Sequence, residues 1–328
     1  MPSWKVIGDE VSALGSAWDV VRRNYLALLH QRTGRNVIVY YSGWLQKGHL
    51  ESAGFRGFGI DDSDKNGFMA TIHKLDRAKG LDLILHTPGG EVAATESIVD
   101  YLRSMFGTDI RAIIPQLAMS AGTMIACSCR EIVMGKQSSL GPIDPQFGGL
   151  AAHGVIEEFE RAAEEIKNDQ RLAFLWQPII AKYTPTLIGE CQKAIAWSSA
   201  MVKDWLVTGM FDGDADAVAK ADAIIAELGS HVLTMSHSRH ISMSRAISLG
   251  LKVLSLEEDH AVQDAVLSLH HACIHTLQET PAFKIIENHE GISFIPALQI
   301  VANGPTAQAI PTGIPTPPSM TQAGVVEE

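Results

Sequence analysis

The sequence lacks the features that mark secreted, membrane-spanning and nucleic-acid-binding proteins. It has four cysteines in 328 residues, too few for a disulfide framework in a chain of this length. No run of about twenty apolar residues occurs, so no transmembrane segment is predicted. Residues 1–15 have no basic region followed by an apolar stretch, so no signal peptide is predicted. The net charge of −11 disfavours nucleic acid as a partner. Together these absences predict a cytoplasmic protein.

The composition is that of an ordinary globular protein, with 46% hydrophobic and 19% charged residues. We expect one domain over residues 1–303, with a core motif region at 35–150 and a mostly helical remainder at 151–303. Proline and glycine positions divide that remainder into helices near 151–177, 185–207, 215–228 and 261–280. Residues 304–328 contain several prolines and few residues that could form a core, and they predict a disordered tail.

Two stretches of the sequence have the pattern strand, turn, helix. The apolar run at residues 81–85 leads into the turn HTPGG at 86–90, and the apolar run at 110–115 leads into AMSAG at 118–122. Short apolar runs bounded by turn residues are typical of buried parallel strands. Parallel strands place their following turns at one edge of the sheet, where ligands bind in open α/β folds. The sequence therefore predicts an α/β protein with a site formed by these two turns.

Ser120 occupies the position in the second turn where a nucleophile would lie. Small neighbours allow a sharp turn that exposes its hydroxyl, although the pattern is not G-x-S-x-G. The N–H groups of Ala121 and Gly90 would then be available as an oxyanion hole, and the missing side chain of Gly90 would allow a substrate to approach closely. Serine is also a favoured helix cap, and the serine taken alone favours that simpler role.

Three motifs taken together resemble the serine dehydrogenase proteinase family: HTPGG at 86–90, AMSAGT at 118–123 and LGPIDPQ at 140–146. A weaker similarity covers residues 284–289. The resemblance implies the clan of the Clp protease and signal peptide peptidase A, with a crotonase-like fold of stacked βα units and a helical C-terminal half. It also implies an ATP-independent serine peptidase that acts on peptides or proteins, forms a homo-oligomer, and uses no cofactor or metal. By position, Ser120 would be the nucleophile, and Gly90, with Gly89 beside it, and Ala121 would bind the oxyanion.

The general base is not obvious from the sequence. No histidine lies between Tyr101 and Phe147, where the Clp protease has its triad histidine, so a Clp-type triad is not supported. Signal peptide peptidase A uses a serine–lysine dyad, and a lysine can serve if its pKa is lowered. Lys182 is our candidate because apolar residues precede it, and Asp144 is a candidate supporting residue. The other candidate lysines are Lys167, Lys193 and Lys203.

Metal binding is disfavoured at the places where ligand types gather. Cys127 and Cys129 are spaced too tightly for a zinc site without a second pair, and they are interpreted as buried small side chains. His231, His237 and His240 lack a carboxylate at matching spacing, as do His271 and His275. His86 is expected to hold its turn by hydrogen bonds rather than to act as the base.

Two other functions fit the same residues. The fold could be a non-catalytic scaffold that binds peptides, in which case an active-site probe would not label Ser120. It could also be an acyl-CoA enzyme whose oxyanion hole holds a thioester enolate, with Ser120 incidental, in which case the chain would bind CoA.

Overall fold

The computed structural model describes residues 6–7, 10, 18–147, 149–229, 238–298 and 311–312. These residues form a mixed α/β structure around a central sheet with the strand order β10-β5-β3-β2-β1-β11-β12. The first five strands in this order are mutually parallel, and β11 and β12 are antiparallel to their neighbours. The strands are β1 (Asn36–Ser42), β2 (Leu81–His86), β3 (Ile110–Ile114), β5 (Glu131–Met134), β10 (Val253–Ser255), β11 (Lys284–Asn288) and β12 (Ser293–Phe294).

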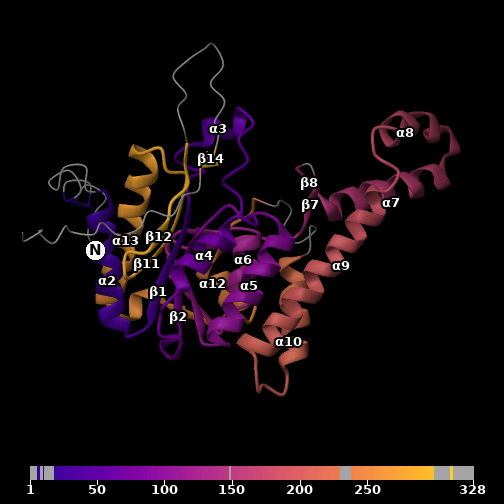
Figure 1. Ribbon diagram of the computed structural model, residues 1–328. Coiled ribbons are helices and arrows are strands. Elements are labelled where there is room, and N and C mark those ends of the chain that lie inside the picture. The colour runs from indigo at the N-terminus through magenta and orange to yellow at the C-terminus, as the bar shows by residue number, and fades with distance from the viewer. Residues whose placement is uncertain are drawn as a thin grey trace, which may run out of the picture.

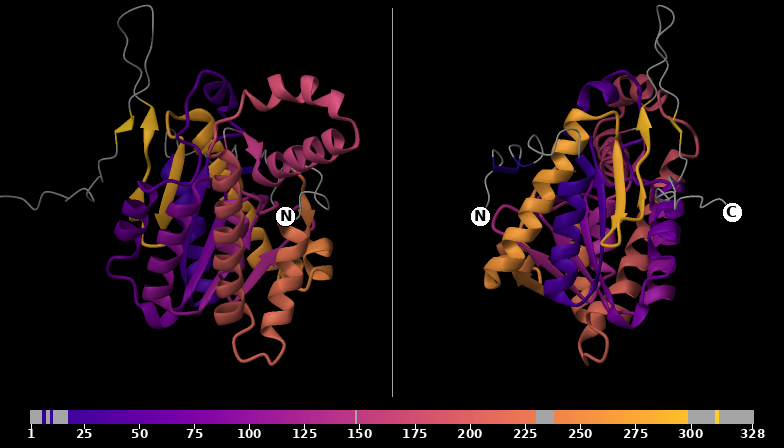
Figure 2. Two further views of the ribbon diagram at one scale, coloured as in Figure 1. Left: turned by 90° about the vertical axis from the view of Figure 1, so that its right-hand side faces the viewer. Right: turned by 60° about the vertical axis from the view of Figure 1, so that its left-hand side comes forward.

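The sheet is covered by helices on both faces (Figure 1). One face carries α4 (Asp64–Ile72), α5 (Val92–Phe106) and α6 (Ala121–Cys127), and the other carries α2 (Trp18–Thr33) and α13 (His260–Glu279). The view at the right of Figure 2 shows α2 and α13 lying side by side, although they come from opposite ends of the chain. Every residue of β1 and β2 is buried, as expected for strands covered on both faces.

Side chains alternate between two hydrophobic cores along each strand. Ile38 and Leu83 belong to the core under α5, whereas Val39 and Ile84 belong to the core under α13. This is the two-residue period of a β-strand. Each apolar run of the sequence therefore contributes side chains to both hydrophobic cores.

A helical arm extends from this body (Figure 1). It consists of α7 (Ala152–Asn168), η2 (Gln170–Leu172), α8 (Ala173–Ile180) and the first part of α9 (Leu187–Trp205). α7 and α9 pack on each other through a small separate cluster that includes Val155 and Cys191. The end of α9 and the π-helical turn η3 (Leu206–Met210) instead belong to the core under α5.

Shorter elements complete the chain. The helices are α3 (Gly48–Ser52), η1 (Arg77–Lys79), α10 (Ala217–Leu228), α12 (Met243–Ser248) and η4 (Leu256–Glu258). A three-stranded sheet joins β4 (Leu117–Ala118), β6 (Ser139–Leu140) and β9 (Ile241–Ser242). The remaining described strands form two-stranded sheets. One pairs β7 (Gln146–Phe147) with β8 (Leu150–Ala151), and another pairs β13 (Ala297–Leu298) with β14 (Pro311–Thr312).

The predicted helical remainder differs from the structure in two places. The first predicted helix, 151–177, is two helices separated by η2, because Asp169 accepts from the Arg171 N–H and starts a new turn. Residues 253–255, 284–288 and 293–294 are strands of the central sheet. The predicted tail at 304–328 lies outside the described residues, apart from 311–312. Among the described helices, none is long and apolar enough to cross a membrane.

Candidate active site

Ser120 has an unusual backbone conformation, with φ 51° and ψ −115°. Only one other non-glycine residue in the described chain has a positive φ. This region costs an L-residue on the order of 1–3 kcal/mol, and surrounding contacts must hold it. Here the N–H of Gly122 donates to the Met119 carbonyl at 2.8 Å, and the hydroxyl of Thr123 donates to the Ala118 carbonyl at 2.8 Å. The chain therefore turns sharply at Ser120 before α6 begins.

The turn after β2 lies directly against Ser120. The Thr87 N–H donates to the Leu117 carbonyl at 3.1 Å, and the Met119 N–H donates to the Thr87 carbonyl at 3.0 Å. A side-chain carbon added to Gly89, whose φ is +102°, would lie 2.7 Å from Cβ of Ser120. Only glycine fits at this position. The two turns predicted from the sequence are thus joined by backbone hydrogen bonds.

The N–H groups of Gly90 and Ala121 are available beside the serine. Neither group donates a hydrogen bond within the part of the chain that the structure describes. Ala121 is the first residue of α6, and Gly90 pairs with Ile60 in an isolated β-bridge. Two unpaired donors next to a hydroxyl have the composition of an oxyanion hole.

Gly90 is required for a reason that the sequence did not indicate. The expectation was that a missing side chain lets substrate approach. In the structure, an added Cβ would instead lie 2.1 Å from the Ile60 nitrogen. The glycine therefore allows the neighbouring segment at Ile60 to approach the turn closely.

Ser120 and Gly90 open into a cleft of about 630 Å³, a size typical of ligand sites. Its titratable lining residues are Arg56, Asp61, Glu91 and Asp144. Ala194 and Trp197 of α9 form part of the wall, and the Trp197 indole donates to Glu96 at 3.3 Å. No lysine or histidine is found among the described residues that line the cleft.

The structure brings most of the predicted site residues together, with one exception. Ser120, Gly89, Gly90 and Ala121 adjoin one another, and Asp144 is buried in the cleft wall. Lys182 is exposed in the turn after α8 on the arm and does not line the cleft. The other candidate lysines do not line it either: Lys167, Lys193 and Lys203 are paired with Glu164, Glu190 and Asp222. The assignment of a lysine as base stays a prediction.

His86 was expected to hold its turn by hydrogen bonds, but packing is its main contact, beside a weak contact with the Leu117 backbone. Its ring is fully buried, and neither ring nitrogen has a partner of normal hydrogen-bond geometry in the described chain. Its ring contacts are with Tyr41, Trp44 and His270, at centroid distances of 5.3, 4.5 and 5.2 Å. Burial lowers the pKa of His86 well below its ordinary value, and the nearby His270 lowers it further. His86 is thus a neutral packing residue on the α13 side of the sheet.

Cys127 and Cys129 are buried behind Ser120, as interpreted from the sequence. Burial raises the pKa of both thiols to about 12, so they remain protonated. Within the described residues, no group of three or more His, Cys, Asp or Glu side chains is arranged to hold a metal ion. His231 and His237 lie outside the described residues.

The sequence did not indicate the buried charged residues that lie next to Asp61 of the cleft lining. Asp64, three residues after Asp61 of the cleft lining, is fully buried against Lys284. A lysine between apolar neighbours, as in Phe283-Lys284-Ile285, was the available signal that an acidic partner would be buried nearby.

The chain is similar to one described protein family and to individual relatives. The family described as ClpP-like SDH-type serine proteinase matches residues 16–269. An uncharacterized protein of Methanocaldococcus jannaschii, MJ0137, is 36% identical over 113 residues, which cover 34% of this chain and 38% of that protein. A second uncharacterized protein of that organism, MJ1495, is 30% identical over 194 residues, or 59% of this chain and 58% of that protein. The chain thus spans less than two thirds of each of these relatives. Since the family match covers most of the sequence, the chain belongs to the ClpP-like SDH-type serine proteinases.

Proposed function

We propose that the chain is an ATP-independent serine peptidase with a crotonase-like fold and with Ser120 as its nucleophile. One observation carries the proposal: a strained serine lies beside two N–H groups that have no acceptor in the described chain, at the edge of a cleft. Strained backbone is concentrated at functional sites, because folding alone gives no reason to keep it.

The chemistry follows from this geometry. The Ser120 hydroxyl oxygen attacks the peptide carbonyl and passes its proton to a base, and the N–H groups of Gly90 and Ala121 stabilise the oxyanion. The base then returns the proton to the leaving amine, so that an acyl-enzyme and a free amine result. Water repeats the attack and releases the acid. Asp144, buried in the wall, is proposed to orient the serine.

The proton acceptor is the open part of this proposal. Lys182 can take the proton only if movement of the arm or assembly with a second chain brings its amine to a cleft. Lys182→Met keeps a similar volume and removes the amine, so it should abolish hydrolysis. An active Lys182→Met enzyme would exclude this residue as the base.

A peptide-binding scaffold is the second candidate, favoured by the finding that no lysine or histidine of the described chain lines the cleft. Labelling with a fluorophosphonate distinguishes the two functions. We expect the probe to label wild type at Ser120, as located by peptide mass spectrometry, and to leave Ser120→Ala unlabelled. A folded wild-type chain that takes no label would support the scaffold.

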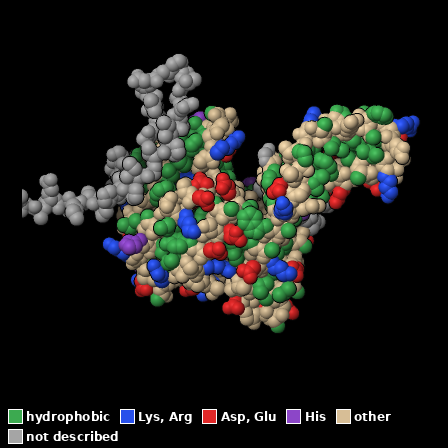
Figure 3. Space-filling view, turned by 45° about the vertical axis from the view of Figure 1, so that its right-hand side comes forward, with side chains coloured by type: hydrophobic (Ala, Val, Ile, Leu, Met, Phe, Trp, Pro, Cys, Tyr) green, Lys and Arg blue, Asp and Glu red, His purple; other side chains and the backbone are tan. Residues whose placement is uncertain are grey.

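We also propose that the chain forms a homo-oligomer through the arm. Phe174 and Leu175 of α8 are 81% and 65% exposed, and Ile179 follows on the same helix. Figure 3 shows hydrophobic side chains on the surface of the arm, away from the body. Large exposed apolar side chains gathered on one element are typical of contact surfaces. Peptides or proteins are the proposed substrates. A cytoplasmic location, which cell fractionation would test, stays a prediction.

A further inference from the structure

A buried ion-pair network lies behind the wall of the cleft. Lys284, at the start of β11, is 1% exposed, and its Nζ lies 2.9 Å from each carboxylate oxygen of Asp64. The same Nζ lies 3.0 Å from Oδ2 of Asp61, and the hydroxyl of Tyr40 donates to Asp64 at 2.8 Å. Asp61 is the member of this network that lines the cleft.

Stability alone does not account for this network. Burial raises the pKa of Asp64 despite the opposing charge of Lys284, so holding this carboxylate in the interior has a cost. Burial opposes the ionisation of Asp61 too, but hydrogen bonds from Ser63 and the charge of Lys284 lower its pKa overall. Buried pairs of this kind often add no net stability compared with apolar side chains of similar volume.

The network is connected to the turn after β2 through the backbone. Oδ2 of Asp64 accepts from the Asp61 N–H at 3.0 Å, which fixes the chain at Asp61. The preceding residue, Ile60, donates its N–H to the Gly89 carbonyl at 2.8 Å and accepts from the Glu91 N–H at 2.9 Å. A single residue, Ile60, thus separates the ion pairs from the turn that bears the oxyanion donor.

These two backbone bonds determine where the Gly90 N–H points. The Gly89 carbonyl and the Gly90 N–H belong to one trans peptide unit and therefore point in opposite directions. Because Ile60 holds the carbonyl, the N–H is directed away from Ile60. Two consecutive glycines have few steric restrictions, so this peptide unit could rotate if Ile60 did not hold it.

We propose that Lys284, Asp64 and Asp61 are positioning residues that hold the segment at Ile60 and thereby aim the Gly90 N–H at the oxyanion. Within the described chain, none of the three forms a hydrogen bond or ion pair with Ser120. The inference rests on the proposed function, because an oxyanion forms only if Ser120 attacks a substrate.

The first test is the rate of reaction of Ser120 with a fluorophosphonate in Asp61→Asn and Lys284→Met. An oxyanion contact forms only in the transition state, so its loss lowers the maximal rate and leaves binding unchanged. We expect the maximal labelling rate to fall about tenfold or more, and the half-saturating probe concentration to stay within about twofold. Unchanged maximal rates in both variants would overturn the proposal.

Glu287→Gln is the matched control. Glu287 lies on the same strand, is fully buried and pairs with Arg22 and Arg23 of α2, on the face away from Asp64. We expect this variant to lose stability and to keep the wild-type labelling rate. If it slows labelling as much as Asp61→Asn, the effect is general destabilisation, and the positioning role is wrong.

Hydrogen exchange at the Glu91 amide separates this inference from the proposed function. Its N–H is bonded to Ile60, so it should exchange about tenfold faster in Asp61→Asn than in wild type, and at the wild-type rate in Glu287→Gln. The exchange measurement remains valid even if the fluorophosphonate does not label wild type. That result would contradict only the proposed peptidase activity. Asp61 is 34% exposed, so its variant remains informative if Lys284→Met does not fold. Equal exchange in wild type and Asp61→Asn would overturn the positioning role.

Discussion

Ser120 and the glycines around it illustrate how close contacts can impose a costly conformation on one residue. The conformation at φ 51° and ψ −115° is one that glycine adopts without strain, and the chain has serine there instead. Gly141 contributes to the confinement, since a Cβ on it would lie 3.1 Å from the Ser120 nitrogen. The proposed role of Ser120 as nucleophile would account for this strain, because that role requires a hydroxyl at this point.

Comparison of Ser120→Gly with Ser120→Ala tests this strain. Both variants should be inactive, because each removes the hydroxyl. Replacing alanine by glycine usually costs about 0.4–1 kcal/mol through the unfolded chain. Here the release of about 1–3 kcal/mol of strain should outweigh that cost, so the glycine variant should be the more stable in urea unfolding. A more stable alanine variant would mean that the backbone at Ser120 is not strained.

Gly90→Ala tests the second turn. The added Cβ would meet the Ile60 nitrogen at 2.1 Å, so the turn must move and carry its N–H with it. We expect kcat/KM for a peptide substrate to fall by about a hundredfold, as for loss of an oxyanion donor. Gly48→Ala is the control, since a Cβ there meets no atom within 4 Å. Wild-type kinetics in Gly90→Ala would show that this turn is only structural.

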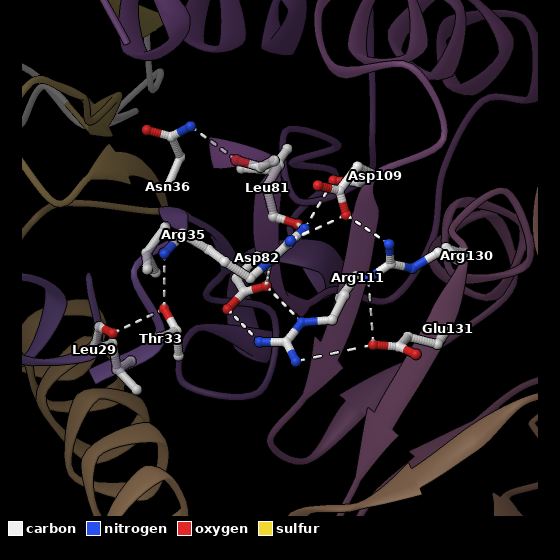
Figure 4. A network of polar contacts seen from close by, with 12 residues as sticks. Leu29, Thr33, Arg35, Asn36, Leu81, Asp82, Asp109, Arg111, Arg130 and Glu131 are labelled. Carbon is white, nitrogen blue, oxygen red and sulfur yellow. Dashed lines mark hydrogen bonds and ion pairs between the residues drawn. The ribbon is translucent and has the colours of Figure 1, made fainter. Parts of the chain in front are cut away.

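At the scale of the element, the central strands are fastened at the end opposite the cleft. Asp82 of β2 is 1% exposed and accepts from Arg35 at 2.7 Å and from Arg111 of β3 at 2.8 and 2.7 Å. Figure 4 shows Asp109, Arg130 and Glu131 extending this network along the strand ends. Charged groups thus join the starts of adjacent strands whose other ends bear the two turns.

Asp82→Asn should destabilise the sheet without affecting the chemistry. It leaves two guanidinium groups without their shared carboxylate, and because both remain partly exposed we expect a loss of about 2 kcal/mol in the free energy of unfolding. Urea denaturation measures this loss, while labelling of Ser120 in the folded protein should keep its wild-type rate. A slower labelling rate at equal folded fraction would contradict the expectation that the Asp82 end of the strands does not affect the end that bears Ser120.

The histidines between β2 and α13 should make stability depend on pH. Burial, and to a lesser degree the charge of His271, lowers the pKa of His270 from 6.5 to about 3 in the folded state. Between pH 6.5 and 3 the unfolded chain binds more protons at His270 than the folded chain does. The stability that the neutral His270 contributes is therefore complete above pH 6.5 and is lost as the pH falls toward 3. Thermal unfolding from pH 7 to 4 should show a falling Tm, and His270→Gln should flatten the slope. An equal slope in both proteins would exclude this histidine.

The two turns could be predicted because their signals are local. Apolar runs at 81–85 and 110–114, followed by small residues, specify strand and turn without reference to distant parts of the chain. The contact between Ile60 and Gly90 could not be predicted, since an isolated bridge between two loops leaves no periodic pattern. The burial of Lys284 and Asp64 depends on pairing between residues 220 apart in sequence. Lys182 was selected for its apolar neighbours, but none of the residues at 179–183 is buried on the arm, and Ile179 is 40% exposed.

At the scale of the whole molecule, the arm has its own small core. The cluster around Val155 and Cys191 is separate from the two cores of the sheet, and among the described elements only α9 belongs to both regions. α9 also contributes Ala194 and Trp197 to the cleft wall. One continuous helix, α9, therefore joins the arm to the cleft wall.

Substitution of the apolar surface of the arm tests the proposed assembly. Phe174→Ser with Leu175→Ser replaces two side chains that are 81% and 65% exposed, so the fold of one chain should change little. If the arm joins subunits, sedimentation velocity should show a smaller species than wild type at the same concentration. Val218→Ser, on α10 and 53% exposed in the native protein, is the control. An unchanged sedimentation coefficient in the double variant would place the interface elsewhere.

The hydrogen bonds between Thr87 and the segment at residues 117–119 have a consequence for how such a sequence can change in length over evolution. The positions of Ser120 and of the turn at 86–90 are set by the register of adjacent segments. One inserted residue displaces everything beyond it by about 3.3 Å and reverses which side chains face which side. The connection through α5 carries no such constraint at its far end, near Gly107, where added residues would extend an exposed loop. Insertions and deletions among relatives should therefore collect near Gly107 and avoid the strands, so that the motifs stay aligned in space while their separation in sequence drifts.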